Sequence, residues 1–405
     1  FECPDQDIEQ IYYFRWWMFR KHLKQTPSGI VITEFLPDVG HGRKYNTIAC
    51  AACLHIEEAR WLRNRRCVSD YLRFWFSPEG EPRRFSSWFA HAIYGYGNAS
   101  ADFGLGESLI DALVENYRSW EKSNRHDSGL FWSHDTNDGG EYSISGDGLR
   151  PTLNAYMYGD AVAIASLASK CGMPDVCAEF EEKAAQLRVL VQTKLWDTTS
   201  EFFKNFPLDV REEAVDSWTF SAVPYERNVR EIYGVLPWKF LLPDAGYERA
   251  WLQLLDEKGF AAPFGPTTAE QRHPRFMKYR RKRCQWDGPS WPFTTSLTMG
   301  ALSELLHEYR QDVIGKQAFL DLFRTYARSQ HRVLPYGDEI PWIGEDLHPH
   351  TGIWLARAIA LEGKSPLVKT HPVVKDMNQA VIRGKDYNHS SYCDLVISGL
   401  VGFRP

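Results

Sequence analysis

The stretch Cys284-Gln285-Trp286-Asp287-Gly288-Pro289-Ser290-Trp291-Pro292 places two tryptophans five positions apart, on either side of an aspartate and a Gly-Pro turn. A helical pattern follows directly, and a proline at its first position is a helix-start signal. The stretch therefore predicts a loop that presents an indole, a carboxylate and a second indole at the N-terminus of a helix. Apolar rings beside a carboxylate suit a sugar, with its C–H face and its rim of hydroxyls. The alternative is a buried tryptophan pair that closes a turn.

The chain around this stretch has 405 residues, of which 43% are hydrophobic and 24% charged, as in a globular protein with a sizeable core. Aromatic residues are abundant: 15 Trp, 19 Tyr and 23 Phe make up 14% of the chain. They suit a large helical core, and they also suit a site built from stacking faces. No shift in composition marks a boundary, so we expect residues 1–405 to form a single domain.

The charge balance excludes several function classes. A net charge of −5 gives no basic footprint for nucleic acid, and no Cys/His spacing is typical of zinc. The basic run Arg280-Arg281-Lys282-Arg283 is interpreted as a solvated loop, and Cys50 and Cys53 as buried core thiols. No apolar run reaches ~18 residues, so no membrane span is expected. The chain begins at Phe1 without a signal-like segment, which indicates a trimmed or mature form and leaves localisation open.

Amphipathic segments of helical period recur along the chain, separated by loops rich in Gly, Pro, Asp and Trp. The predicted helices span residues 8–25, 46–64, 68–76, 86–93, 107–122, 151–171, 175–196, 228–233, 247–257, 292–309, 316–328, 351–361 and 389–401. Residues 29–35 are the best strand candidate. Helical hairpins in series, joined alternately by short and long loops, predict an all-α fold: an (α/α)6 toroid of six hairpins whose long loops form a pocket on one rim.

Three long loops carry polar and aromatic side chains, at residues 130–150, 284–292 and 341–352. Hydrolysis of a glycosidic bond needs one carboxylic acid to protonate the leaving oxygen and one carboxylate to activate water or attack. Carboxylates on separate loops of one rim could face each other across a sugar. Apolar neighbours such as Trp132, Tyr142 and Trp342 would raise the pKa of an acid by desolvation. Solvated connecting loops are the alternative interpretation.

The motifs of these loops carry a family resemblance. Trp286-x-Gly288-Pro289-x-Trp291 resembles the W-x-G-P-x-W signature of glycoside hydrolase family 63 and its mannosylglycerate-hydrolase-like relatives, which are (α/α)6 toroids that invert the anomeric centre. Glu345, six residues before Thr351-Gly352, resembles the general base in the family's E-x(5)-T-G segment. The segment 386–391 is similar to the family's aromatic-Ser segment ahead of the last helix.

The general acid is less clearly marked. Gly139-Gly140-Glu141-Tyr142-Ser143 resembles the family's G-x-D-N-S loop, whose Asp is the acid, but here a Glu stands in place of the Asp and no Asn follows it. Asp147, in Ser145-Gly146-Asp147, is the competing candidate, closer in residue type but shifted in position. We prefer Glu141.

A wider set of residues is predicted to bind substrate, from residue type and position on the same rim. These are Trp286, Asp287, Trp291, Trp132, His134, Arg150, Asn154, Tyr156, Trp342, Asp38, Tyr45 and Asn46. For Asp38, the alternative to substrate binding is a role as a simple turn residue. His134, His348 and His350 are scattered, so we predict no metal site and no cofactor.

The resemblance implies an inverting, exo-acting glycosidase that cleaves an α-glucoside or α-mannoside type of bond in an oligosaccharide or glycoside. A furanosidase such as an arabinofuranosidase, or a lyase on the same toroid, is the enzyme alternative, because a scaffold does not fix the sugar. A sugar-binding protein with a degenerate site is the alternative from another class, since the acid loop departs from the family pattern. A helical scaffold that uses its tryptophans only for packing is the third.

Overall fold

A computed structural model describes residues 1–208, 219–278, 284–334, 337–361 and 384–405, so the basic run at residues 280–283 lies outside the described residues. The α-helices are α1 (Gln6–Lys21), α2 (Ala52–Ala59), α3 (Arg66–Trp75), α4 (Phe89–Ser100), α5 (Gly104–Ser108), α6 (Ile110–Asn124), α7 (Pro151–Lys170), α8 (Pro174–Lys194), α10 (Leu252–Leu255), α11 (Pro292–Glu308), α12 (Lys316–Ser329) and α13 (Leu355–Leu361). The 3-10 helices are η1 (Lys44–Asn46), η2 (Ala49–Ala51), η3 (Asp135–Asp138), η4 (Phe220–Ala222), η5 (Ile232–Phe240) and η6 (Glu248–Trp251), and the segment η7 (Leu395–Leu400) is π-helical.

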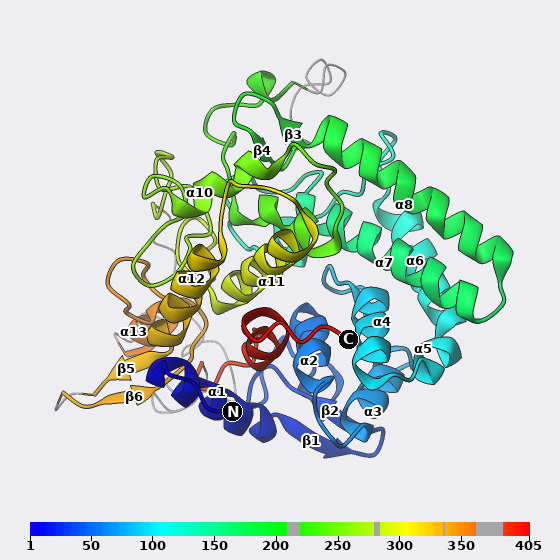
Figure 1. The fold of residues 1–405 in the computed structure, drawn as a ribbon, viewed down its shortest axis with the longest axis horizontal. Coiled ribbons are helices and arrows are strands. Elements are labelled where there is room, and N and C mark those ends of the chain that lie inside the picture. The colour runs from blue at the N-terminus through cyan, green and yellow to red at the C-terminus, as the bar shows by residue number, and fades with distance from the viewer. Residues whose placement is uncertain (209–218, 279–283, 335–336, 362–383) are drawn as a thin grey trace.

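Two layers of helices make up most of the molecule (Figure 1). Helix α7 packs against α4, α6 and α8, and α11 packs against α12, η5 and η7. Helix α1 packs against α12, so the first and late parts of the chain lie side by side. The C-terminus lies near the middle of the view, between α2 and α4.

Burial distinguishes the inner helices from the outer ones. Helices α7 and α11 are buried on nearly every side for most of their length, and their small residues let neighbouring helices approach closely. Helices α3 and α12 are amphipathic and bury one face only. The inner helices α7 and α11 each begin with a proline at the first position, as the sequence predicts.

Three two-stranded antiparallel sheets depart from the all-α prediction. They are formed by β1 (Leu23–Thr26) with β2 (Gly29–Ile32), β3 (Trp196–Asp197) with β4 (Phe202–Phe203), and β5 (His331–Val333) with β6 (Glu339–Pro341). The first predicted helix was too long, because the chain leaves α1 at Lys21 and turns back through Pro27. The Thr26 hydroxyl donates to the Gly29 carbonyl at 2.7 Å and closes that turn.

Other helix boundaries also needed correction. The predicted helix at 46–64 becomes an α-helix only at Ala52, because Asn46 has positive φ and Thr47 and Ile48 are extended, and it ends at Ala59. The predicted helix at 228–233 was wrong; a 3-10 helix, η5, begins at Ile232 and contains Pro237, which has no N–H for an α-helical ladder. The last predicted helix is largely the π-helical η7.

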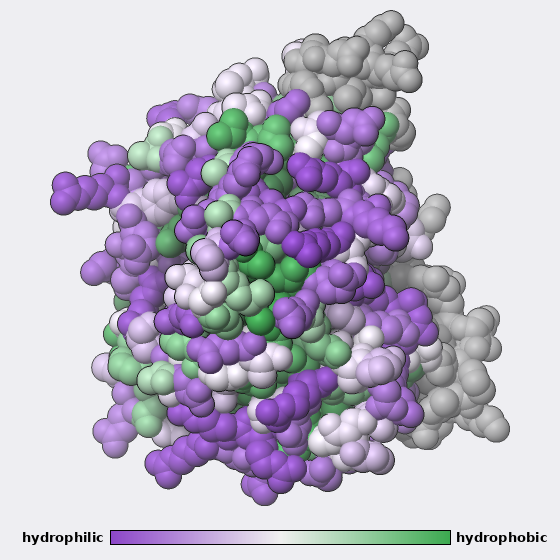
Figure 2. Space-filling model, turned by 90° about the vertical axis from the view of Figure 1, so that its right-hand side faces the viewer, coloured by the Kyte–Doolittle hydropathy of each residue, from purple (hydrophilic) through white to green (hydrophobic). Residues whose placement is uncertain are grey.

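The side of the molecule drawn in Figure 2 is mainly hydrophilic, with small hydrophobic areas between polar ones. Within the described residues, no helix has the length and apolar character needed to cross a bilayer. The eight cysteines are all free thiols, and Cys50 and Cys53 are buried, which confirms their interpretation as core thiols.

Candidate active site

Three loops that are distant in sequence meet before the N-terminus of α11. The backbone of Ser290 exchanges two hydrogen bonds with that of Leu347, at 3.0 and 2.9 Å, so the tryptophan loop is paired with the loop that carries Glu345. On its other side the Trp286 indole N–H donates to Oε2 of Glu141 at 2.9 Å. The structure therefore brings together the carboxylates that the sequence placed on separate loops.

A tight backbone path positions Glu141. Gly139 has φ +66°, and a Cβ at this position would lie 2.7 Å from the Cys50 sulfur, so only glycine fits. Tyr142 also has positive φ, and the Tyr233 hydroxyl donates to the Gly139 carbonyl at 3.0 Å. The turn holds the Glu141 carboxyl against Trp286.

Burial raises the pKa of Glu141 to about 7. Two hydrogen bonds, one of them from Trp286, act in the opposite direction, while the charges of Asp135 and Glu345 add to the increase. Glu141 and Glu345 thus lie within electrostatic range of each other. A carboxyl group with this pKa still carries a proton in a large fraction of molecules at neutral pH.

Asp346 lies beside Glu345 and has a different environment. Its carboxyl group is buried and accepts from the backbone of Ala356 at 3.3 Å. Burial raises the pKa of Asp346 to about 8, and the charge of Glu345 adds to the effect. Asp346 therefore keeps its proton at neutral pH and adds no negative charge next to Glu345. The partly buried Cys284 thiol lies among the same groups, since desolvation raises its pKa and Glu345, Glu141 and Asp346 all raise it further.

The two tryptophans of the opening stretch are packed against each other, so their predicted role as sugar-stacking faces needs correction. Trp286 and Trp291 stack with ring centroids 4.3 Å apart, and Tyr233 stacks on Trp286 at 5.6 Å. Each tryptophan is only 1% exposed. The ring faces are used for packing, and the contribution of Trp286 to the site is its N–H group.

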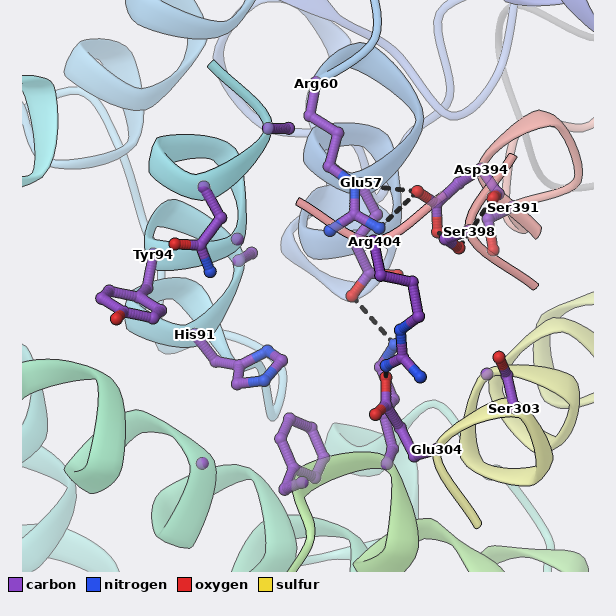
Figure 3. Close-up of a pocket in the computed structure, with 18 of the residues that line it drawn as sticks. Glu57, Arg60, His91, Tyr94, Ser303, Glu304, Ser391, Asp394, Ser398 and Arg404 are labelled. Carbon is purple, nitrogen blue, oxygen red and sulfur yellow. Dashed lines mark hydrogen bonds and ion pairs between the residues drawn. The ribbon is translucent and has the colours of Figure 1, made fainter. Parts of the chain in front are cut away.

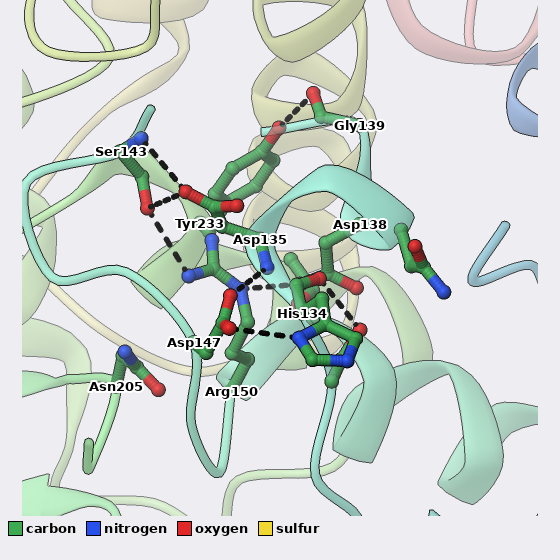
Figure 4. A network of polar contacts seen from close by, with 12 residues as sticks. His134, Asp135, Asp138, Gly139, Ser143, Asp147, Arg150, Asn205 and Tyr233 are labelled. Atoms are coloured by element: carbon green, nitrogen blue, oxygen red, sulfur yellow. Dashed lines mark hydrogen bonds and ion pairs between the residues drawn. The ribbon is translucent and has the colours of Figure 1, made fainter. Parts of the chain in front are cut away.

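The acid loop is held from below by a buried arginine (Figure 4). Arg150 pairs with Asp138 at 2.7 Å, donates to the Gly146 carbonyl at 2.6 Å and reaches the Ser143 hydroxyl at 3.3 Å. Ser143 in turn donates its N–H to Asp135 at 3.2 Å. Arg150 was predicted to bind substrate, but it is 1% exposed and its contacts support the loop.

Asp147 lies on the outer side of this loop, away from the Trp286 contact. Its side chain is 52% exposed and accepts from the His134 ring and the Asp135 amide, at 2.7 and 2.8 Å. Partial burial acts to raise the pKa of Asp147, but these hydrogen bonds outweigh it and hold the pKa below its ordinary value. A residue that titrates at low pH and faces solvent is a poor general acid, so the geometry favours Glu141.

Two further residues that were predicted to bind substrate belong to the interior. Asn154 is fully buried and joins the backbone of Phe131 to that of Arg150 through three hydrogen bonds. Tyr156 is buried against Trp88, with centroids 4.6 Å apart. Both follow Arg150 on α7, where the helix has already entered the core.

The predicted binding residues Asp38, Tyr45 and Asn46, which precede α2, also need correction. Asn46 is buried and binds the backbone of residues 35, 37 and 39, so it organises the loop. Asp38 is 74% exposed and pairs with Lys24 at 3.5 Å. The Tyr45 hydroxyl lies 3.1 Å from the Ser28 hydroxyl. These partners account for all three side chains without a sugar.

The remaining predicted residues are placed differently. Trp132 is half-buried, with its ring edge-on to the exposed His134 at 5.1 Å, at the outer end of the acid loop. Trp342 is buried beneath the Arg332 guanidinium, 4.5 Å from its ring centroid. Asp287 is fully buried, and its carbonyl accepts from Met277 at 2.8 Å.

A buried polar group that the sequence interpretation missed lies on the other side of the carboxylates. Glu34 accepts from the Tyr387 hydroxyl at 2.7 Å and lies 3.6 Å from Nδ1 of His389, whose other ring nitrogen is 3.4 Å from the Cys50 sulfur. Burial raises the pKa of Tyr387 well above its usual range, and Glu34 and Glu345 add to this. The available signal was the charged Glu34 inside the apolar run Ile30-Val-Ile-Thr-Glu-Phe35.

No three His, Cys, Asp or Glu side chains in the described ranges form an arrangement suited to a metal ion. The mostly helical architecture matches the fold of solved six-hairpin glycosidases. The sequence profile of the mannosylglycerate hydrolase MGH1-like glycoside hydrolase domain matches residues 44–390, and the chain belongs to this family. It is a glycoside hydrolase domain.

Solved structures agree with this assignment. A protein described as a sialidase superposes with a TM-score of 0.86 at 37% identity over 100% of this chain, which spans about a third (34%) of that protein's length. The GH63 mannosylglycerate hydrolase from Thermus thermophilus in complex with glucose gives 0.63 at 12% identity, over 84% of this chain and 94% of that one. The neutral trehalase Nth1 from Saccharomyces cerevisiae gives 0.50 at 13% identity, over 86% and 70%. No curated protein sequence matches the chain.

Proposed function

We propose that the chain is an inverting, exo-acting glycosidase in which Glu141 is the general acid and Glu345 the general base. The observation that carries the proposal is the buried Glu141 carboxyl, whose raised pKa suits a general acid, within electrostatic range of the second carboxyl group, Glu345. Glu141 is kept protonated by burial up to about pH 7, while Glu345 lies beside an Asp346 that holds its own proton. Burial that raises the pKa of one carboxyl group of a pair suits that group to the acid role.

In this mechanism Glu141 gives its proton to the glycosidic oxygen as the bond to the anomeric carbon breaks. Glu345 takes a proton from a water molecule that attacks the opposite face of the same carbon. The attack inverts the configuration, and the two carboxyl groups end with exchanged protonation states. The Trp286 N–H orients Glu141 and stabilises its carboxylate after the proton has left.

We also propose that the helices complete the (α/α)6 toroid of six hairpins. Support comes from two helical hairpins, one formed by α7 and α8 and the other by α11 and α12. In each hairpin the first helix is the more deeply buried one. In such a toroid the three loops of the site would share one rim.

A neutral sugar of the glucoside or mannoside type suits the cluster better than an anionic one. A sugar carboxylate would meet the charges of Glu345 and Glu34, and the Arg150 guanidinium is committed to Asp138 and lies 4.0 Å from Glu231. The basic run at residues 280–283, which lies outside the described residues, directly precedes the tryptophan loop in the sequence. Because basic side chains attract an anionic sugar, a sialoside also belongs in the substrate panel.

The deciding experiment is NMR detection of the product anomer on a panel of α-glucosides, α-mannosides, arabinofuranosides and a sialoside. We expect hydrolysis of a neutral pyranoside with inverted product, and loss of turnover in both Glu141→Gln and Glu345→Gln. Retained configuration would overturn the mechanism. Release of arabinose would favour the furanosidase, and binding without turnover across the panel would favour a carbohydrate-binding protein.

A further inference from the structure

A second cavity, of about 310 Å³, lies among the inner helices and is separate from the carboxylate cluster. Its walls come from α2, α4, α7, η5, α11 and the C-terminal segment, and Figure 3 shows the side chains that point into it. On α11 the cavity begins with Ser296 and centres on Gly300 to Glu304, whereas the candidate active site precedes Pro292. At 1.5 Å per residue, Pro292 and Glu304 are about 18 Å apart along the helix.

A packed layer separates the two sites. Trp88 and Tyr156 are buried against each other at 4.6 Å, and Leu297 is buried on the adjoining turn of α11. Tyr156 feels the charge of Asp138 on the active-site side and of Glu57 on the cavity side. The cavity is therefore separate from the carboxylate cluster of the candidate active site.

The charged groups of the cavity are matched one to one. Arg60 pairs with Asp394 at 2.6 Å and Lys239 with Glu57 at 3.0 Å. A third pair joins Arg404 to Glu304. An ionic ligand would have to break one of these pairs and leave a partly buried charge without its partner, which is costly.

The imidazole ring of His91 has hydrogen-bonding capacity to spare. It lines the cavity and makes no side-chain hydrogen bond among the described residues; its Nδ1 has no accessible surface, so Nε2 is the nitrogen that a ligand would reach. Figure 3 shows the His91 ring pointing into this space. Burial, helped by the charges of Lys239 and Arg60, lowers the pKa of His91 to about 3, so its ring is neutral. A neutral imidazole can donate at one nitrogen and accept at the other, as a hydroxyl group can.

We propose that this cavity is a second ligand site that takes a neutral, polyhydroxylated molecule of monosaccharide size. Hydroxyl groups can bond Nε2 of His91 and the Ser303 hydroxyl without disturbing the ion pairs. Phe240 and Tyr94 line the same cavity and offer apolar surface to the C–H face of such a molecule. The volume is at the lower end of ligand pockets, which are about 300–1,000 Å³.

Gly300 allows the cavity to be filled without removing a polar group. A Cβ at this position would meet only the Lys239 ammonium, at 3.4 Å, so a longer side chain has space to extend. Gly300→Leu should therefore block the cavity. Gly300→Ala is the matched control, because it makes the same backbone change with little added volume.

The test is a titration of the 405-residue chain with glucose, mannose, galactose and myo-inositol, and with sulfate as the anionic probe. The histidine ring signals are followed by NMR, with the His91 signal assigned by comparison with His91→Gln. We expect a neutral probe to shift the His91 signal saturably, with affinity about tenfold weaker or worse in Gly300→Leu and near wild type in Gly300→Ala. No shift with any neutral probe, a shift with sulfate alone, or unchanged affinity in Gly300→Leu would overturn the proposal.

The same titration in Glu345→Gln separates this inference from the proposed catalytic function. The His91 shift should persist in that variant. Loss of the shift there would mean that the probe acts through the first site, which also overturns the proposal. Absence of hydrolysis by the wild-type chain would leave the His91 result intact and would refute only the catalytic assignment.

Discussion

Replacing Trp286 with phenylalanine should move the pH dependence of hydrolysis without removing activity. The indole N–H donates to the Glu141 carboxyl at 2.9 Å and lowers its pKa against the larger, opposite effect of burial. A general acid must be protonated, so activity is lost as pH rises through the pKa of Glu141. With the donor removed, the carboxylate is less stable, the pKa rises and the loss of activity moves to higher pH.

The size of the shift follows from the hydrogen bond. A bond to a charged acceptor contributes about 1.5–3 kcal/mol, and one to a neutral acceptor about 0.5–1.5 kcal/mol. The difference of about 1–1.5 kcal/mol favours the carboxylate over the acid, which corresponds to about one pKa unit. We expect the basic limb of the kcat/KM profile near pH 7 in the wild type and about one unit higher in Trp286→Phe.

Trp291→Phe is the matched control for this experiment. This substitution removes one indole from the same stacked pair. In the wild type, however, the Trp291 N–H donates to the Gln285 carbonyl at 2.9 Å and does not touch Glu141. Both variants should lose similar packing energy, seen as a lower Tm, and only Trp286→Phe should move the basic limb. An unmoved limb in Trp286→Phe, or an equal movement in both variants, would refute the reasoning.

Four other substitutions give direct tests. Glu345→Gln should lower kcat by about 10²–10⁴-fold with an unchanged Tm, whereas Asp147→Asn, at an exposed position, should stay near wild type; a reversed order in initial-rate assays would contradict the assignment. Arg150→Met should reduce the free energy of unfolding in urea by about 3–5 kcal/mol, because Asp138 would be left as a buried charge without its partner; a loss below about 1 kcal/mol would mean that the pair is not buried in solution. Burial raises the pKa of Asp160 to about 8, so the folded state binds more protons than the unfolded state between about pH 4 and 8, and stability falls as pH rises through that window. Asp160→Asn should flatten this part of the stability curve, and a slope equal to that of the wild type would exclude Asp160 as its source.

Helix positions followed closely from the sequence where local signals were complete. The helices at Pro151 and Pro292 begin where proline predicts, and the adjacent predicted helices at 151–171 and 175–196, separated at Gly172, correspond to α7 and α8. The predicted strand at residues 29–35 is confirmed in part by β2. The other strands and the 3-10 segments were not predicted, because strands of two to four residues and 3-10 turns leave little periodic pattern. Their pairing depends on contacts made elsewhere in the chain.

The sequence by itself determined the chemistry available at the site: carboxylates on three loops, an indole pair, and motifs that point to a glycosidase family. Only the tertiary structure decided which carboxylate has the properties of an acid. Glu141 and Asp147 are six residues apart and chemically alike, yet one is buried against Trp286 and the other is solvent-exposed beside His134. Desolvation raises a carboxyl pKa and hydrogen bonds lower it, and neither is visible until the chain folds. For the same reason the two tryptophans, which suggested a sugar platform in sequence, are packed ring against ring, and one N–H group remains as their contact with the candidate acid.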